Sequence, residues 1–151
     1  METISKGIVV LPNAGKSMQM RPGETLIFKA VSAETDGAYT LIEVIDEPQE
    51  GPSLHLHRRE DKSFYILEGT FAFQIGDRTL VATAGCFIQA PKGVPHGYKN
   101  IGTTPGKMLL LFVPAGIETF FEDFAKLTAA GTVDEASIMS VAKKHEIEFV
   151  A

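Results

Sequence analysis

Three of the four histidines in this chain of 151 residues stand where they could bind one metal ion. His55 and His57 are two residues apart, so in a β-strand their side chains would point to the same face. Neutral imidazole suits Zn, Cu, Fe and Ni, which makes these two a natural pair of metal ligands. His96 follows a turn rich in Pro and Gly (91–95), which would hold it rigidly, as a third ligand or as a structural hydrogen-bonding group. His145 lies near the end of a predicted helix and is left out of the site.

The spacing around His96 fits a longer pattern. Residues 85–100 match Gly-x5-Pro-x-Gly-x2-His-x3-Asn at every fixed position, and His55, His57 and Gly69 match Gly-x5-His-x-His-x3,4-Glu-x6-Gly. Together these resemble the two motifs of the cupin superfamily, and the segment between His55 and Gly69 resembles its small quercetinase-like branch. The resemblance implies an antiparallel β-barrel whose mouth holds one divalent first-row metal ion (Fe, Mn, Ni, Cu or Zn) on His55, His57 and His96.

Two positions depart from the cupin pattern. Gly51 stands three residues before His55 instead of five, which only shortens a loop. The acidic ligand is the larger departure, because Lys62 occupies its place and neither Glu60 nor Asp61 fits both flanking spacings. Asp61 and Lys62 would also point to opposite faces of a strand.

Lys62 leaves three interpretations open. In the first, three histidines alone hold the metal, and Lys62 turns aside, loses its proton or pairs with Glu60, Asp61 or Glu43, since a cation weakens metal binding. In the second, no metal is bound, and Lys62 with His96 acts as acid and base or holds an anionic substrate. In the third, Lys62 extends into solvent and has no function.

The rest of the chain predicts the elements that would position these residues. Short apolar runs alternate with Gly and Pro turns, which is typical of an all-β antiparallel barrel; for a cupin this is the jelly roll, or double-stranded β-helix. The runs expected to form strands are 4–11, 25–31, 38–46, 63–67, 70–75, 79–82, 86–90, 95–99 and 107–113. The alternation from Phe71 to Val81 predicts a hairpin.

The pattern changes after the last expected strand. Apolar residues recur at helical spacing from Ile117 to Leu127, and Thr132 with Glu135 forms a capping box that opens a second helix through about Lys144. We expect these two C-terminal helices to cover one side of the barrel or to build a dimer contact. The chain is predicted to be one domain (1–151), with a barrel at about 4–114 and a helical segment at about 117–145.

Composition limits the partners. The net charge of −5 argues against nucleic acid, and no apolar window is long enough to span a membrane. The chain starts with no apolar stretch of signal length, and its single Cys86 cannot form an internal disulfide, so a cytoplasmic location is the default expectation. The cupin resemblance makes a homodimer the expected assembly.

The leading functional hypothesis is an enzyme. A small oxygenated organic substrate would chelate the metal in the barrel, in chemistry resembling a quercetinase-type dioxygenase, and cupins also include isomerases, decarboxylases and cyclases. The candidates for the apolar pocket wall are Phe64, Tyr65, Phe71, Phe73 and Phe87. The alternatives are a ligand-binding module without catalysis and a metal-free isomerase or cyclase that uses Lys62 and His96.

Overall fold

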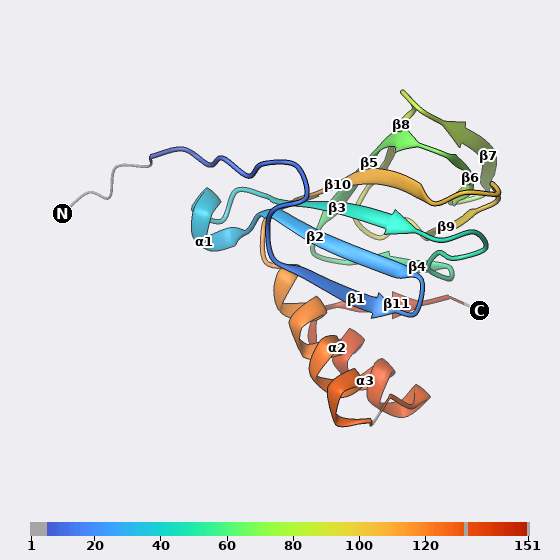
Figure 1. Cartoon of the computed structure of the whole chain (residues 1–151). Coiled ribbons are helices and arrows are strands. Elements are labelled where there is room, and N and C mark those ends of the chain that lie inside the picture. The colour runs from blue at the N-terminus through green and yellow to red at the C-terminus, as the bar shows by residue number, and fades with distance from the viewer. Residues whose placement is uncertain (1–5, 132, 151) are drawn as a thin grey trace.

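The computed structural model describes residues 6–131 and 133–150, which form two facing antiparallel sheets with helices at one side (Figure 1). The first sheet has the strand order β1 (Ser17–Arg21), β2 (Glu24–Ala30), β3 (Thr40–Asp46), β10 (Gly106–Val113), β5 (Asp61–Glu68) and β8 (Phe87–Ala90). The second has the order β11 (Ile147–Phe149), β4 (His55–His57), β9 (His96–Asn100), β6 (Thr70–Ile75) and β7 (Arg78–Thr83). The described helices are α1 (Ser32–Thr35), α2 (Glu118–Ala130) and α3 (Glu135–Lys144).

The core lies between the two sheets because alternate residues of each strand face inward. In β5, Phe64 and Ile66 are buried while Tyr65 between them is exposed. Phe71 and Phe73 of β6 reach the same interior from the second sheet. This all-β jelly-roll arrangement is the one predicted from the sequence, and the hairpin between β6 and β7 is confirmed by its continuous antiparallel register.

The start of the barrel differs from the prediction. A strand was expected over 4–11, but residues 6–16 form a loop, and residues 4 and 5 lie outside the described part of the chain. Val9 and Leu11 are largely exposed, so their apolar side chains gain little from burial there. The first strand is instead β1, which pairs with β2.

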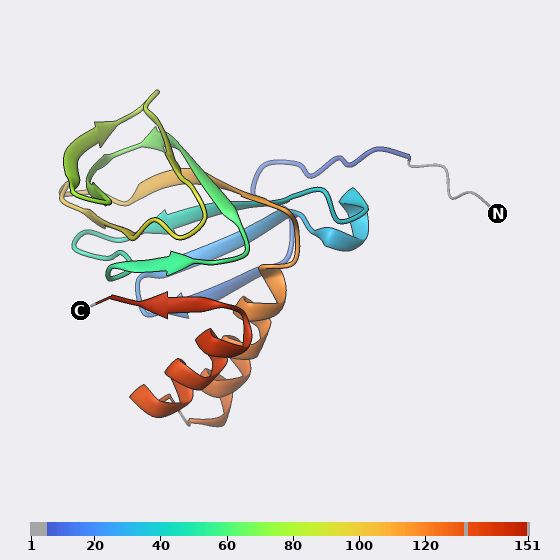
Figure 2. The ribbon, with the colours of Figure 1, turned by 180° about the vertical axis from the view of Figure 1, so that it is seen from behind.

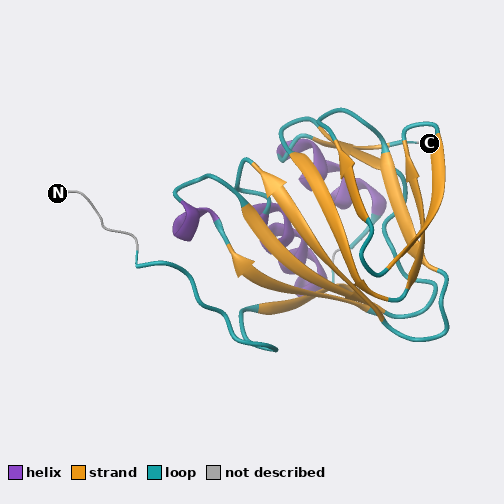
Figure 3. Cartoon of the chain, turned by 90° about the horizontal axis from the view of Figure 1, so that it is seen from above, coloured by secondary structure: helices purple, strands orange, loops and turns teal. Residues whose placement is uncertain are grey.

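The C-terminal segment packs against the barrel and then rejoins it (Figures 2 and 3). Helices α2 and α3 lie together on one side of the sheets, tied by His145 Nε2, which contacts Asp123 Oδ2 at 2.7 Å. The N-cap of α3 is Asp134, which accepts a hydrogen bond from the amide of Ser137, whereas the predicted cap residue Thr132 lies outside the described residues. After α3 the chain forms β11, which pairs along all of β4. No helix among the described residues is long and apolar enough to cross a membrane.

Candidate metal centre

The two sheet strands β4 and β9 bring the three predicted histidines together. His55 and His96 are direct cross-strand partners, and His57 follows two residues along β4. The ring centroids lie 4.4 Å apart for His55 and His96, 5.1 Å for His55 and His57, and 5.4 Å for His57 and His96. All three side chains are buried, and one ligand atom from each can be chosen so that all lie within 4.8 Å of one another.

Hydrogen bonds to the outer ring nitrogens orient two of the imidazoles. His55 Nδ1 lies 2.7 Å from the carbonyl of Ser53, and His96 Nδ1 lies 3.0 Å from the carbonyl of Val94. A carbonyl only accepts, so each Nδ1 carries the proton and each Nε2 keeps a free lone pair. This is the tautomer that a metal ligand needs, and the two carbonyls hold it in place.

The same geometry leaves buried nitrogen atoms without partners. Nε2 of His57 and Nε2 of His96 are shielded from solvent and accept no hydrogen bond, and Nδ1 of His57 has only Glu60 Oε2, at 3.4 Å. Buried polar atoms are normally paired, so unpartnered lone pairs within a few ångströms of one another fit a cation that both would bind. A divalent metal therefore fits this donor set, with Glu60 positioned to orient His57 from behind.

Burial also keeps the histidines neutral. It lowers the pKa of His55 and of His57 well below the usual value, and the positive charge of Lys62 adds to the effect on both. The pKa of His96 falls to about 2, again through burial first and Lys62 second. Neutral imidazole is the ligand form, so no proton has to leave these rings before a metal binds.

Lys62 lies inside the barrel, on the inward face of β5, and not in solvent. Its ammonium stands over the rings of Phe64 and Phe112, 5.0 and 5.3 Å from their centroids, and makes no ion pair within the described chain. Burial lowers its pKa to about 8, against the opposing pull of Glu24, Glu60 and Asp46. Outward extension of Lys62 is therefore wrong, and cation–π contacts take the place of the expected acidic partner.

The two acids beside Lys62 have separate positions. Glu60 is buried behind His57, and burial raises its pKa above the usual value. Asp61 points to the other face of β5, as the alternation predicted, and its Oδ1 accepts a hydrogen bond from the Lys92 amide. Within the described ranges, the cluster that can hold a metal contains the three histidines and no acid.

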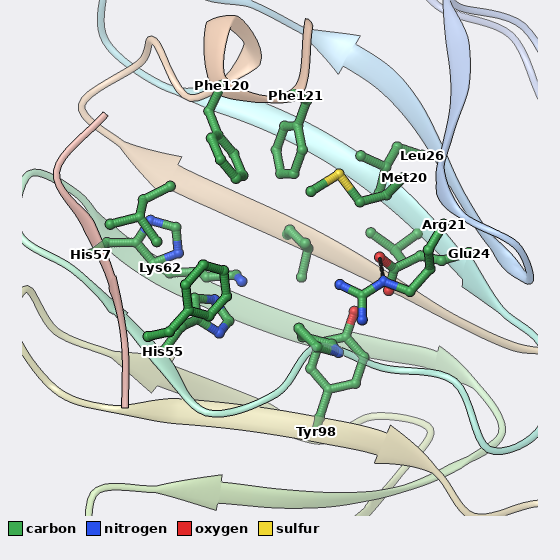
Figure 4. A pocket seen from close by; sticks show the side chains of 15 residues that line it. Met20, Arg21, Glu24, Leu26, His55, His57, Lys62, Tyr98, Phe120 and Phe121 are labelled. Carbon is green, nitrogen blue, oxygen red and sulfur yellow. Dashed lines mark ion pairs between the residues drawn. The ribbon is translucent and has the colours of Figure 1, made fainter. Parts of the chain in front are cut away.

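A cavity of about 70 Å³ extends from the histidines across the barrel. Figure 4 places His55, His57 and Lys62 at one side of it, Arg21, Glu24 and Tyr98 at the other, and Phe120 and Phe121 above. The remaining lining residues are Met20, Leu26, Val44, Pro52, Leu110, Ile147 and Phe149.

The predicted pocket wall was wrong at all five positions. Phe64, Phe71 and Phe73 are buried in the core instead, while Tyr65 and Phe87 are 45% and 66% exposed on the outer surface. The aromatic lining comes from Phe120, Phe121 and Phe149 of the C-terminal segment and from Tyr98 of β9. The apolar stripe of the predicted helix contains the first two; the helices were expected to cover one side of the barrel, but no sequence pattern indicates that this side is the site.

Comparison with known proteins agrees with this architecture. Residues 42–112 match the family model described as a cupin domain, which supports a small cupin domain over this part of the barrel. A solved structure of KdgF from Halomonas sp. aligns with a TM-score of 0.68 at 18% identity, over 76% of this chain and 99% of that one. A predicted oxalate decarboxylase from Thermotoga maritima aligns with a TM-score of 0.58 at 20% identity, over 76% and 99%.

One curated protein is similar in sequence. Mannose-1-phosphate guanylyltransferase 2 from Escherichia coli is 33% identical over 67 residues. These residues are 44% of this chain and 14% of that protein, so the similarity is confined to a small part of a much longer protein.

Proposed function

We propose that this protein is a metal-dependent cupin enzyme that acts on a small oxygenated organic anion, with dioxygenase chemistry of the quercetinase type as the first candidate. The observation that carries the proposal is the set of unpartnered, buried imidazole nitrogens of His57 and His96, with His57 and the buried ammonium of Lys62 lining one cavity. Perturbed ionisable groups gathered in a cavity are typical of active sites.

Residues at different positions in the cavity would bind the metal, bind the substrate and exclude water. His55, His57 and His96 would hold a divalent ion (Fe, Mn, Ni, Cu or Zn), which supplies Lewis acidity and coordination positions for O₂ or a chelating substrate. Lys62 would hold the negative charge of the substrate through its ammonium. Phe120 and Phe121 exclude water from the side that α2 covers.

The size of the cavity limits the substrate. Pockets for drug-sized ligands enclose roughly 300–1,000 Å³, whereas this cavity is about 70 Å³. A fused-ring flavonol would fit only if Phe120 and Phe121, which lie above the cavity, moved away. We therefore favour a short acid or hydroxy-keto compound as the substrate. The description of one similar structure as a predicted oxalate decarboxylase is compatible with a substrate of that size.

A second candidate is a metal-free isomerase or cyclase. It is favoured by one observation, that burial brings the pKa of Lys62 to about 8, in the range where an amine can give and take protons near neutral pH. Lys62 would then give and take the proton, because the pKa of about 2 leaves His96 too weak a base for the role that the sequence suggested.

Metal analysis tests the first candidate. We expect purified protein to retain about one equivalent of divalent metal, and His57→Ala to lose at least about tenfold in metal affinity because one of three ligands is gone. His145→Ala is the matched control, since His145 lies outside the cluster and should leave the metal content unchanged.

Activity then separates the candidates. Turnover of short keto and hydroxy acids that is abolished by chelators and by His57→Ala supports the metal enzyme. Turnover that survives chelators and is lost in Lys62→Met supports the metal-free enzyme instead. Ligand binding without turnover in the metal-loaded protein would identify a binding module.

A further inference from the structure

The side of the cavity opposite the histidines contains a second group of buried polar residues. Glu24 of β2 and Asp46 of β3 are direct cross-strand partners, and their exposed fractions are 5% and 0%. Two carboxyl groups placed directly opposite each other repel when ionised, and burial adds a desolvation cost. Because such a pair is costly to bury, it points to a role in binding.

Asp46 is directed inward, where Glu24 and Tyr98 both act on its carboxyl group. It stands two residues from Val44, which lines the cavity, so alternation along β3 puts both side chains on the interior face. Both carboxyl oxygens of Asp46 are fully shielded from solvent and unpaired. Glu24, which lines the cavity itself, contacts Arg21 Nε at 3.5 Å. Buried groups of this kind need a partner, and the pair reaches the cavity through Glu24, which lines it directly across from Asp46.

The charges around the pair favour a neutral partner over a cation. Burial raises the pKa of Asp46 to about 9, with the neighbouring Glu24 adding to the shift, so Asp46 keeps its proton at neutral pH. Arg21 offsets the charge of Glu24 and is itself fixed by a 3.0 Å hydrogen bond to the carbonyl of Gly51. The group can therefore both donate and accept a hydrogen bond, which matches an alcohol hydroxyl.

Tyr98 completes this side of the cavity from the second sheet. Its side chain is buried, and Figure 4 shows its hydroxyl end pointing toward Arg21 and Glu24. The backbone next to it is fixed closely, because a Cβ on Gly51 would lie 2.0 Å from the carbonyl oxygen of Tyr98. The donor and acceptor groups are therefore held in place before a ligand arrives.

We propose that Glu24, Asp46 and Tyr98 bind the distal hydroxyl of the substrate, and that the substrate is a short hydroxy acid. Its carboxylate end lies at the histidines and Lys62, and its terminal alcohol lies between β2 and β3. The placement of the carboxylate end rests on the proposed function. The placement of the terminal alcohol rests on the acid pair alone.

Two acids that differ by one hydroxyl test the proposal. Glycerate carries a terminal hydroxyl where lactate carries a hydrogen, and isoserine carries an amine there. Calorimetric titration of the metal-loaded protein is expected to give glycerate an affinity about tenfold higher than that of lactate, since a hydrogen bond to a charged group contributes about this factor. Isoserine is expected to bind no better than lactate.

Variants assign the preference to the acid pair. Glu24→Met and Asp46→Leu are expected to bring the glycerate-to-lactate affinity ratio close to one while leaving the metal content unchanged. Asp46→Asn keeps a donor and an acceptor and should preserve the preference. Glu43→Met, on the outer face of the same strand β3, is the matched control and should behave as wild type. Thermal melting of each variant establishes that it is folded.

Several results would overturn the inference. These are equal affinities for glycerate and lactate in the wild type, no binding of either, or a preference that persists in both Glu24→Met and Asp46→Leu. Tighter binding of isoserine would assign the site to an ammonium group and exclude the hydroxyl. The proposed function fails separately, when lactate binds His57→Ala as well as it binds wild type; a retained glycerate preference in that variant would leave the distal site standing.

Discussion

Lys62 decides the charge of the site at the residue scale. The cupin pattern would place an acid there, which would neutralise part of the charge of a bound metal. Here the ammonium is stabilised by the faces of Phe64 and Phe112, so it stays in the barrel without an acidic partner. Three neutral imidazoles and a cation leave the site positive, and a positive, buried site selects anions.

Asp46 makes a prediction about stability and pH. Its pKa of about 9 in the folded protein lies above the 3.8 of the free side chain, so the folded state holds a proton that the unfolded state has lost. Stability contributed at this site is therefore highest below pH 3.8 and falls as the pH rises toward about 9, by at most about 1.4 kcal/mol per pH unit. Asp46→Asn removes this loss.

The measurement is urea unfolding of wild type and Asp46→Asn from about pH 5 to about pH 8. The variant should gain stability relative to wild type as the pH rises, because an amide does not ionise. The other ionisable groups facing Asp46 are Glu24, Arg21, Tyr98 and Lys62, and all remain in the variant. A difference that stays constant across this range would mean that Asp46 is ionised in the folded protein.

At the scale of single residues, the sequence predicted the side of the cavity that carries the histidines and Lys62. It did not predict the side that carries Glu24 and Asp46. The motif spacing located the three histidines and Lys62, because short-range spacing on β4, β5 and β9 fixes their faces. Glu24 and Asp46 are far from these motifs, and their register becomes visible only when β2 pairs with β3. Glu60 was considered as a ligand, yet it stands behind His57, since a turn intervenes before β5.

At the element scale, the C-terminal segment belongs to the site. Helix α2 contributes Phe120 and Phe121 to the cavity, and β11 contributes Ile147 and Phe149 while pairing with the strand that carries His55 and His57. The helices therefore do more than cover the barrel.

One side chain anchors α2 and gives the prediction at this scale. Glu118 accepts hydrogen bonds from the Ser32 amide at 2.8 Å, the Ser32 hydroxyl, the Thr40 hydroxyl at 2.7 Å and the Gly116 amide at 3.1 Å. Glu118→Gln loses the charge that strengthens these bonds and turns an NH2 group, which cannot accept, toward hydrogen-bond donors. We expect it to lower the free energy of unfolding by about 1–3 kcal/mol and to speed hydrogen exchange in α2.

The pH dependence and a control make this prediction specific. These hydrogen bonds lower the pKa of Glu118 below its usual 4.5, so its stabilisation is present above pH 4.5 and is lost as the pH falls through the lowered value. The difference between wild type and variant should shrink accordingly in acid. Glu122→Gln, with only a 3.7 Å surface ion pair to Lys16, should change stability by less than about 0.5 kcal/mol. Equal effects of the two variants would contradict the anchoring role.

Elements were predictable where a local pattern decides them. Period-two alternation located the hairpin of β6 and β7, and the helical stripe located α2, which begins at Glu118. The run 4–11 is as apolar as a strand, but no strand pairs with its described part. Apolar character alone therefore led to a wrong strand prediction. Strand β11 is only three residues long and forms through pairing with β4, which is a tertiary contact that no local pattern encodes.

At the scale of the whole molecule, the outer surface carries one aromatic pair. Tyr65 of β5 and Phe87 of β8 are cross-strand partners on the outer face of the first sheet, 45% and 66% exposed. Strand β8 is the edge of that sheet, so one side of its backbone is free to pair with another chain. Exposed apolar neighbours at a free edge are typical of interaction surfaces.

The homodimer expected from the cupin resemblance can be tested at this edge. If two copies associate through β8 and bury Tyr65 and Phe87, light scattering after size exclusion should give twice the 16.4 kDa of one chain, and Phe87→Ser should shift the mass to that of the monomer. The metal content should not change, because Phe87 lies outside the cavity. Val9→Ser replaces a side chain that is 86% exposed in the N-terminal loop and serves as the control. A dimer that persists in Phe87→Ser would place the interface on another face of the barrel, and a monomeric wild type would remove the dimer altogether.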